Sequence, residues 1–129
     1  MRAEELKGHL DAVLLAALEG GPRHGYAVIE ALRQSTDGRL DLPTGTIYPA
    51  LRRLEQAGLI AGTWSVVGGR RRREYQLTPV GVRALSGRRA AWRDFSATVT
   101  AALESAALVN AALENAALED TACPSPNPA

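Results

Sequence analysis

The sequence predicts a mainly α-helical chain with one small β-hairpin: a winged helix-turn-helix followed by a long C-terminal dimerisation helix. Three observations predict this fold class. Leucines recur at helical spacing near the N-terminus, two strand-like runs flank a pair of glycines, and a heptad-like apolar stripe follows the second run. We expect a winged helix-turn-helix domain over residues 1–78, a dimerisation helix over 79–120 and a disordered tail over 121–129.

Two helices are expected first along the chain. Four leucines recur at every fourth position and mark the apolar face of the first helix: Leu6, Leu10, Leu14 and Leu18. The run Gly20–Pro22 ends this helix, because glycine and proline interrupt helices. A second helix is expected from about Tyr26 to Gln34, with an apolar face formed by Val28, Ile29 and Leu32.

The most informative stretch is TGTIYPALRRLEQAGLI, from Thr44 to Ile60, which predicts a third, short amphipathic helix. Three residues at helical spacing should face the core: Ile47, Leu51 and Leu54. Tyr48 and Arg52 fall on other faces of this helix. The helix is therefore either an ordinary core helix with a solvated basic face or one that offers a face to a partner, and its own residues favour neither.

The ends of the third helix carry their own signals. Thr44 or Thr46 can cap its start, because a threonine oxygen accepts a hydrogen bond from the first turn. Pro49 favours the later cap, since proline is best tolerated in that turn. Gly58 suits the left-handed residue that ends a helix.

A hairpin is expected after the third helix. Thr63–Val67 and Glu74–Thr78 are rich in β-branched and aromatic residues, and Gly68 and Gly69 supply the turn between them. The run Arg70–Arg73 then lies at the tip of the hairpin and the start of the return strand, where long cationic side chains can reach phosphates. A run of like charges is often only a solvated surface, but this one lies beside a basic helix.

Charge is unevenly distributed along the chain. The 129 residues carry a net charge of +1, with 46% hydrophobic and 22% charged residues, which suits one modest core. Residues 50–93 hold ten arginines against two glutamates, a net charge of +8, whereas residues 94–129 have a net charge of −5. A local basic segment of this kind favours nucleic acid as the partner. With no apolar run of membrane-span length and no signal-peptide pattern, we expect a cytoplasmic protein without a membrane partner.

Cysteine, histidine and motif content argue against several other classes. The single cysteine, Cys123, lies in a proline-rich tail and cannot form an internal disulfide. His9 and His24 have no partner cysteines at metal-ligand spacing and are expected to be surface or helix-end histidines. The sequence contains no phosphate-binding GxxxxGK[ST] loop, nucleophile elbow or HExxH motif. We therefore expect no enzyme activity, no metal and no cofactor.

Three ordered motifs resemble the PadR (phenolic acid decarboxylase repressor) family of winged helix-turn-helix transcriptional regulators. They are HGY at His24–Tyr26, GTIYPALRRLE at Gly45–Glu55, and the glycine-arginine run that leads into Tyr75 and the LTP sequence. The resemblance extends from Lys7 to about Val99. It implies a homodimer that binds a pseudo-palindromic double-stranded DNA operator and represses a neighbouring gene until a small ligand releases it.

The resemblance also implies which residues contact DNA. The matching helix enters the major groove, so the inferred contacts are Thr44, Thr46, Tyr48, Pro49 and Arg52, with Arg53 on the DNA backbone. The inferred wing residues are Gly69, Arg70, Arg71, Arg72 and Arg73. One departure is Glu74, which stands before Tyr75 where the family often has two aromatics. Its carboxylate would weaken binding to phosphates unless it pairs with an arginine.

The C-terminal third is expected to form the dimer. Thr78 and Pro79 provide a cap and a first position for a helix with this apolar stripe: Leu85, Trp92, Phe95, Val99, Ala102 and Ala106. The alternative is that the stripe packs on the core of the same chain. The family resemblance implies that an interface containing Trp92, Phe95 and Val99 binds a small aromatic effector through Trp92, and the alternative for Trp92 is a purely structural role.

The segment 101–120 is a repeat with a five-residue period: AALES, AALVN, AALEN, AALED. A β-helix with the same period would need more copies than four to bury a core. Alanine, leucine and glutamate favour helix instead, so we expect a helical extension of the dimerisation helix.

Two function classes are consistent with the sequence. The basic helix, the arginine wing and the apolar stripe favour a DNA-binding repressor. The alternative is a winged-helix protein-interaction module that uses the same surface to bind an acidic partner.

Overall fold

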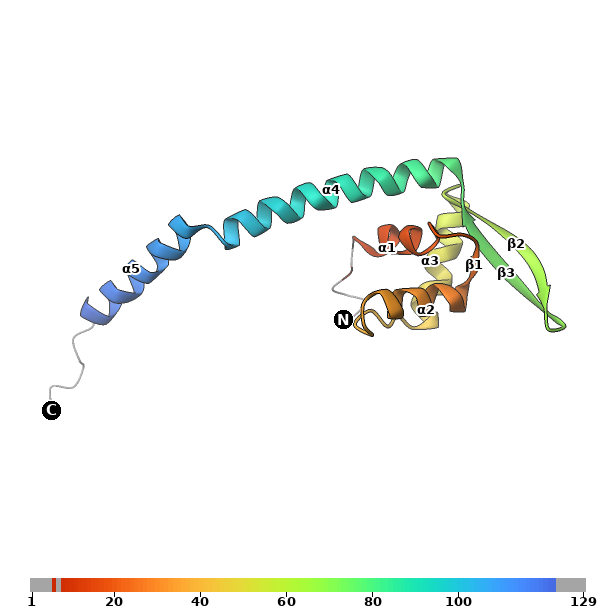
Figure 1. The fold of residues 1–129 in the computed structure, drawn as a ribbon, viewed down its shortest axis with the longest axis horizontal. Helices are drawn as coiled ribbons and strands as arrows, with labels where there is room; N and C mark the ends of the chain where they lie inside the picture. Colours follow the sequence, from red (N-terminus) through yellow and green to blue (C-terminus); the bar gives the residue numbers. More distant parts are fainter. Residues whose placement is uncertain (1–5, 7, 123–129) are drawn as a thin grey trace. The chain divides into compact units, whose positions relative to one another are not determined.

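A computed structural model describes residue 6 and residues 8–122, and Figure 1 shows the order of its elements. The helices and strands are α1 (Leu10–Ala17), β1 (Arg23–His24), α2 (Gly25–Ser35), α3 (Thr44–Gln56), β2 (Ile60–Val67), β3 (Arg70–Leu77), α4 (Pro79–Leu103) and α5 (Ala106–Ala122). The chain divides into two compact units, one ending at Arg89 and the other beginning at Ala90. The first unit therefore continues past the domain boundary expected at residue 78.

Helices α1, α2 and α3 lie together and enclose the core of the first unit (Figure 1). The apolar faces expected from periodicity are buried there, including Leu14, Val28, Ile47, Leu51 and Leu54. Helix α1 is shorter than the leucine repeat suggested, since Leu6 precedes it and Leu18 is its C-cap, although both side chains are buried. This core orients α3 so that its opposite face is exposed.

The start of α3 differs from expectation, whereas its end confirms it. The N-cap is Pro43, and no side chain caps the helix, so neither Thr44 nor Thr46 is the cap. The carbonyl of Pro43 accepts hydrogen bonds from the backbone N–H groups of Thr46 and Ile47, so the N–H of Thr46 is bonded without a threonine oxygen. At the other end, Gly58 has a φ of 79°, as the sequence predicts.

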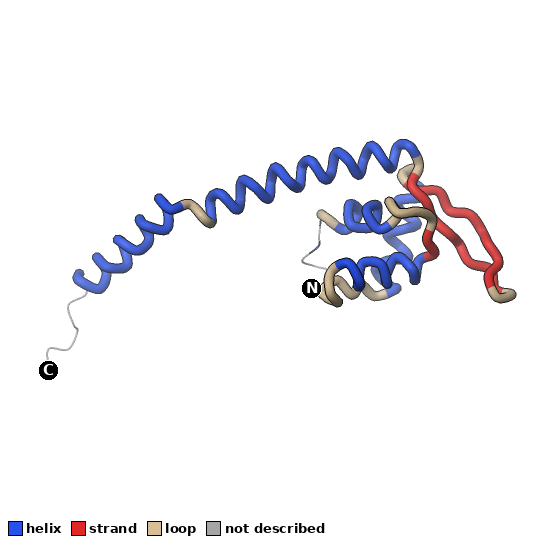
Figure 2. Tube along the Cα trace, viewed as in Figure 1, coloured by secondary structure: helices blue, strands red, loops and turns tan. Residues whose placement is uncertain are grey.

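A three-stranded antiparallel sheet in the order β1-β3-β2 completes the winged helix-turn-helix (Figure 2). Strands β2 and β3 form the expected hairpin, and Gly68 and Gly69 both have positive φ values in its turn. Strand β1 was not expected from the sequence. Its two residues pair with β3, Arg23 opposite Tyr75 and His24 opposite Glu74. The pairing holds the start of α2 against the middle strand.

The first turns of α4 are part of the first unit. Thr78 caps the helix as expected, since its Oγ1 accepts a hydrogen bond from the backbone N–H of Gly81 at 3.1 Å. Gly81 is buried so close to the carbonyl of Leu59 that a Cβ would lie 1.9 Å from that oxygen. Leu85 is also buried in the core of this unit, which removes it from the apolar stripe expected to be exposed.

In the second unit, the remaining stripe residues are exposed. The relative exposures of Trp92, Phe95 and Val99 are 50%, 57% and 38%, and the two aromatic rings lie 6.0 Å apart between centroids. The expectation that the stripe runs unbroken into Ala106 is wrong, because α4 ends at Leu103.

The repeat segment is helical, as expected, but it is interrupted. Glu104 and Ser105 separate α4 from α5, and Ser105 starts the new helix through its Oγ, which accepts a hydrogen bond from the N–H of Leu108 at 3.4 Å. Thr121 and Ala122, expected to be disordered, belong to α5. The rest of the tail, including Cys123, lies outside the described residues.

By length and composition alone, the helical stretch Pro79–Ala117 is long and apolar enough to span a membrane, since an 18-residue window within it has a mean hydropathy of 1.2. This differs from the sequence-based expectation of no apolar run of membrane-span length. The interruption at Glu104 and Ser105 lies inside the stretch, so it is not one continuous α-helix. A bilayer span without continuous helical hydrogen bonding would leave backbone groups unsatisfied.

Candidate nucleic-acid interface

One face of α3 is exposed and carries most of the residues that the sequence analysis selected. Thr44, Tyr48, Pro49 and Arg52 are all exposed, whereas Thr46 is half-buried. Arg53 is exposed as well, but its guanidinium forms an ion pair with Asp11 of α1 at 2.5 Å. The α3 face, which we define as Thr44, Tyr48, Pro49 and Arg52, is therefore accessible to a partner.

Tyr48 is held in position by α2. Its ring lies against the backbone of Gly25, where an added Cβ would lie 2.4 Å from Cε1 of the tyrosine. Only a residue without a side chain allows this approach, which explains why glycine follows His24 in the HGY motif. With its ring supported on one side, Tyr48 still has 41% of its surface exposed.

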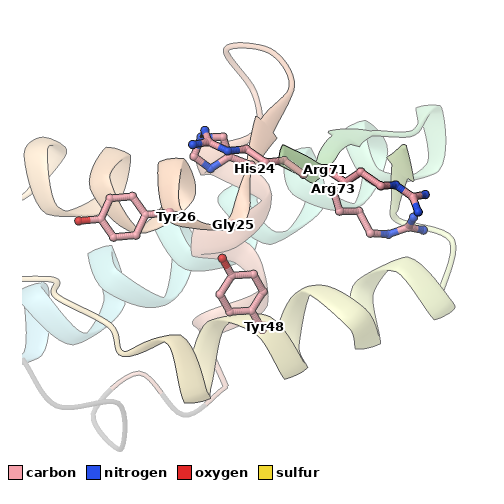
Figure 3. A pocket seen from close by; sticks show the side chains of 7 residues that line it. His24, Gly25, Tyr26, Tyr48, Arg71 and Arg73 are labelled. Atoms are coloured by element: carbon pink, nitrogen blue, oxygen red, sulfur yellow. Dashed lines mark hydrogen bonds between the residues drawn. The ribbon is translucent and has the colours of Figure 1, made fainter. Parts of the chain in front are cut away.

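A cleft of about 540 Å³ lies beside the α3 face, between the start of α2 and the hairpin. It is lined by His24, Gly25, Tyr26, Tyr48, Arg71, Arg72 and Arg73. Figure 3 shows the hydroxyl of Tyr48 directed toward Gly25, with Arg71 and Arg73 extending away from His24. The lining holds three arginines and no carboxylate, so the cleft favours an anionic ligand.

The four arginines of the hairpin divide between the two faces of the sheet. Strand register places Arg73 opposite Trp64 and Arg71 opposite Val66, and directly opposed residues share a face. The guanidinium carbons of Arg71 and Arg73 lie 4.6 Å and 5.3 Å from the centroid of the Trp64 ring. Arg70 and Arg72 belong to the opposite face.

Arg73 is used within the molecule. Its guanidinium donates a hydrogen bond to Oε2 of Glu55, and this ion pair connects α3 to β3. The hydrogen bond to Glu55 raises the pKa of Arg73. The same carboxylate oxygen accepts a hydrogen bond from the backbone N–H of Gly62 at 3.3 Å. Arg73 therefore differs from the other three arginines, although the sequence alone predicts one common role for all four.

Glu74 follows the arginines of the wing, and its carboxylate would weaken phosphate binding unless it forms an ion pair with an arginine. Among the residues that the structure describes, it forms no ion pair within 4.0 Å. It is half-buried and lies opposite His24 and Thr63 in the sheet. Within the described part of the chain, no arginine is therefore paired with this carboxylate.

His24 is the residue whose role the sequence analysis underestimated. It is a helix-end histidine, as expected, because its Nδ1 accepts a hydrogen bond from the backbone N–H of Ala27 at 3.2 Å. In addition, its Nε2 lies 3.0 Å from Nη1 of Arg72. The only local sign was its place before Gly25 and Tyr26. Within the described part of the chain, no group of three or more His, Cys, Asp or Glu side chains could hold a metal ion.

The exposed basic helix, the cationic hairpin and the cleft between them form a winged helix-turn-helix surface suited to a nucleic acid. Residues 14–87 match the transcriptional regulator PadR-like family. The chain belongs to the PadR-like family. It is therefore a DNA-binding transcriptional regulator with a winged helix, which favours DNA binding over the acidic protein partner considered as the alternative.

Other transcriptional regulators are similar to this chain in sequence and in structure. A transcriptional regulator of Mycobacterium tuberculosis is 39% identical over 77 residues, which are 60% of this chain and 59% of that protein. The crystal structure of a PadR family regulator from Eggerthella lenta has 32% identity and a TM-score of 0.68, covering 80% of this chain and 88% of that one. A PadR-like regulator from Bacillus cereus has 28% identity and a TM-score of 0.69, with 79% and 98% covered.

Proposed function

We propose that this PadR-like protein is a cytoplasmic, homodimeric repressor that binds a pseudo-palindromic operator and is released by a small, flat aromatic ligand. The observation that carries the DNA part of the proposal is the α3 face, exposed beside a cleft lined by three arginines. Repression and release rest on the likeness to the PadR family.

In this proposal the α3 face enters the major groove. Tyr48 and Arg52 contact base edges, because they are exposed on consecutive turns of the helix and can form apolar and hydrogen-bonding contacts there. Thr44, Thr46 and Pro49 lie near the same groove, and Arg53 contacts the backbone of the DNA if it leaves Asp11. The wing formed by Gly69 and Arg70–Arg72 contacts phosphates or the minor groove, and Arg73, the last wing residue, supports the hairpin through its ion pair with Glu55.

The proposed homodimer joins two copies through the second unit. Trp92, Phe95 and Val99 support it, because three large apolar side chains on one helix are exposed together. Burying them against a second copy would remove this apolar surface from water. Two copies present two α3 helices, so a two-fold symmetric protein would bind a pseudo-palindromic site.

The proposed effector binds at Trp92. Its indole ring is half-exposed and lies 6.0 Å from the ring of Phe95, so the two rings offer aromatic surface to a flat ligand. A packing role for Trp92 in the dimer interface is the competing possibility.

An electrophoretic shift assay tests the DNA proposal. The full chain should shift the DNA fragment upstream of its own gene at lower concentration than an unrelated fragment of equal length. The affinity should fall steeply as salt rises, because phosphate contacts release counterions. A chain that shifts both fragments equally at every salt concentration would not be a sequence-specific repressor.

Sedimentation equilibrium tests the dimer. The wild type should sediment as a dimer, whereas Trp92→Ala/Phe95→Ala should shift toward the monomer. Val82→Ala is a suitable control, because Val82 is 54% exposed but belongs to the first unit. A wild type that stays monomeric at high concentration would overturn the dimer proposal.

Fluorescence quenching tests the effector. The chain contains two tryptophans, so the measurement needs Trp64→Phe, which leaves Trp92 as the only indole. Planar aromatic compounds should quench this emission saturably and should weaken DNA binding. If no such compound quenches Trp92, its role is packing alone.

A further inference from the structure

The contacts of His24 cannot both be hydrogen bonds. Nδ1 faces the N–H of Ala27 at 3.2 Å, and Nε2 faces Nη1 of Arg72 at 3.0 Å. Both of these neighbours are donors, but a neutral imidazole has one acceptor nitrogen and one N–H, and a protonated imidazole has no acceptor. In one of the two contacts, an N–H of the imidazole therefore faces another N–H donor, and no hydrogen bond forms between them.

Of the two contacts, the hydrogen bond from the N–H of Ala27 to Nδ1 of His24, which caps α2, is the one that forms. The N–H of Ala27 belongs to the first turn of α2 and has no intrahelical partner, so it depends on Nδ1. Arg72 is long and exposed and can turn elsewhere. With Nδ1 as the acceptor, Nε2 carries the ring proton, and His24 and Arg72 present two N–H donors toward the same point.

The acceptor missing between these donors should be an anion. Arg72 forms no ion pair with any residue that the structure describes. No carboxylate lines the cleft, Glu74 opposite His24 in the sheet forms no ion pair with Arg72, and Tyr26 and Tyr48 add only hydroxyl groups. A guanidinium and a neutral N–H suit the oxygens of a phosphate, which can accept from both donors at once.

We propose that His24 and Arg72 together hold one phosphate of the DNA backbone in this cleft. The inference rests on the proposed DNA-binding surface and adds a contact from the start of α2 to those of α3 and the wing. Such a contact fixes the position of the protein on the duplex and carries no sequence information of its own.

Two substitutions separate this role from the helix cap. His24→Asn keeps an acceptor for the N–H of Ala27, because asparagine is among the best N-cap residues, but removes the Nε2 donor. Arg72→Gln removes the charge. Binding is measured by fluorescence anisotropy on the upstream fragment of the gene and on an unrelated duplex of equal length, over a salt series. Urea unfolding checks that each variant is as stable as the wild type.

The expected results are specific. His24→Asn should weaken binding to both duplexes by the same factor, about tenfold, with an unchanged salt dependence. Arg72→Gln should lower the slope of log affinity against log salt by about one. The double variant should lose less affinity than the product of the two single losses, because both side chains hold the same phosphate.

Other results overturn the proposal. If His24→Asn binds both duplexes as the wild type does, His24 is only a cap, and DNA binding itself stands. If inorganic phosphate shifts the ring resonances of His24 while His24→Asn still binds DNA normally, the cleft is a site for free phosphate. If the wild type binds neither duplex, the proposed function falls together with this inference.

If His24→Asn is less stable than the wild type, a scan of the DNA backbone with uncharged phosphate analogues tests the proposed contact instead. Each phosphate of the bound duplex is replaced in turn by a methylphosphonate. One position per half-site should weaken the wild type and leave Arg72→Gln unaffected. A duplex without such a position would contradict the proposal.

Discussion

The ring of Tyr48 rests directly on the backbone of Gly25, so that α2 holds the central side chain of the α3 face in place. A Cβ at Gly25 would lie 2.4 Å from Cε1, 2.7 Å from Cζ and 2.9 Å from the hydroxyl oxygen of this ring. The position of a proposed base-contacting residue therefore depends on a glycine in another helix.

Gly25→Ala should displace Tyr48. We expect the free energy of unfolding to fall by about 1–3 kcal/mol, the usual cost of overpacking, and DNA affinity to fall with it. Urea unfolding and anisotropy measure the two effects. In a Tyr48→Ala background the same substitution should cost much less, since the obstructing ring is absent. Equal costs in both backgrounds would mean that the contact does not position Tyr48.

Arg73→Gln should act on the fold more than on DNA. Its guanidinium is paired with Glu55, so the variant should unfold at lower urea concentration and leave the salt dependence of DNA binding close to that of the wild type. Arg70→Gln, on an exposed guanidinium of the other face, should instead lower the salt slope by about one. The reversed pair Glu55→Arg/Arg73→Glu should recover part of the lost stability. Identical salt slopes for Arg70→Gln and Arg73→Gln would refute this division.

Gly81→Ala should be strongly destabilising. The new Cβ would lie 1.9 Å from the carbonyl oxygen of Leu59, and neither backbone can move away easily. We expect a loss of about 3 kcal/mol or more in the free energy of unfolding. Gly87→Ala in the same helix is the matched control, because nothing lies within 4 Å of its Cβ. It should raise stability by about 0.5–1 kcal/mol, and similar effects at both sites would be inconsistent with the close approach.

The pair formed by Glu19 and Arg89 should make stability depend on pH. Hydrogen bonds from Arg89 at 2.6 Å and 2.8 Å hold the pKa of the Glu19 carboxyl below its ordinary value of 4.5. A carboxylate whose pKa is lowered by folding stabilises the fold above its unfolded pKa, and this contribution disappears as pH falls through the folded pKa.

Arg89→Gln should therefore unfold at slightly lower urea concentration than the wild type near neutral pH. The difference should vanish at a pH well below 4.5, where Glu19 is protonated. It should be small, because the two side chains are 40% and 53% exposed. Arg88→Gln serves as the control, since Arg88 forms no ion pair among the described residues. A difference that persists unchanged in acid would point to packing of Arg89 as the cause.

Local signals predicted much of this fold. The apolar spacing of Ile47, Leu51 and Leu54 placed α3, Gly58 marked its end, and Thr78 marked the start of α4, because each depends on residues within one or two turns. Strand β1 gave no such signal, since two residues become a strand only when β3 lies beside them.

The candidate site was only partly predictable for the same reason. Tyr48 and Arg52 were selected from the sequence, and both are exposed on α3. The partners of Arg73 and Arg53 could not be foreseen, because Glu55 and Asp11 are 18 and 42 residues away in the chain. The contact of His24 with Arg72 spans 48 residues and also depends on tertiary structure.

The central claim is that the α3 face distinguishes DNA sequences while the hairpin arginines supply affinity. The most direct measurement compares the affinities of two variants for the upstream fragment and for an unrelated duplex. Tyr48→Ala/Arg52→Ala should lose most of the ratio between the two affinities, whereas Arg70→Ala/Arg71→Ala/Arg72→Ala should lose affinity for both and keep the ratio. If both variants change the ratio equally, the α3 face does not read the sequence.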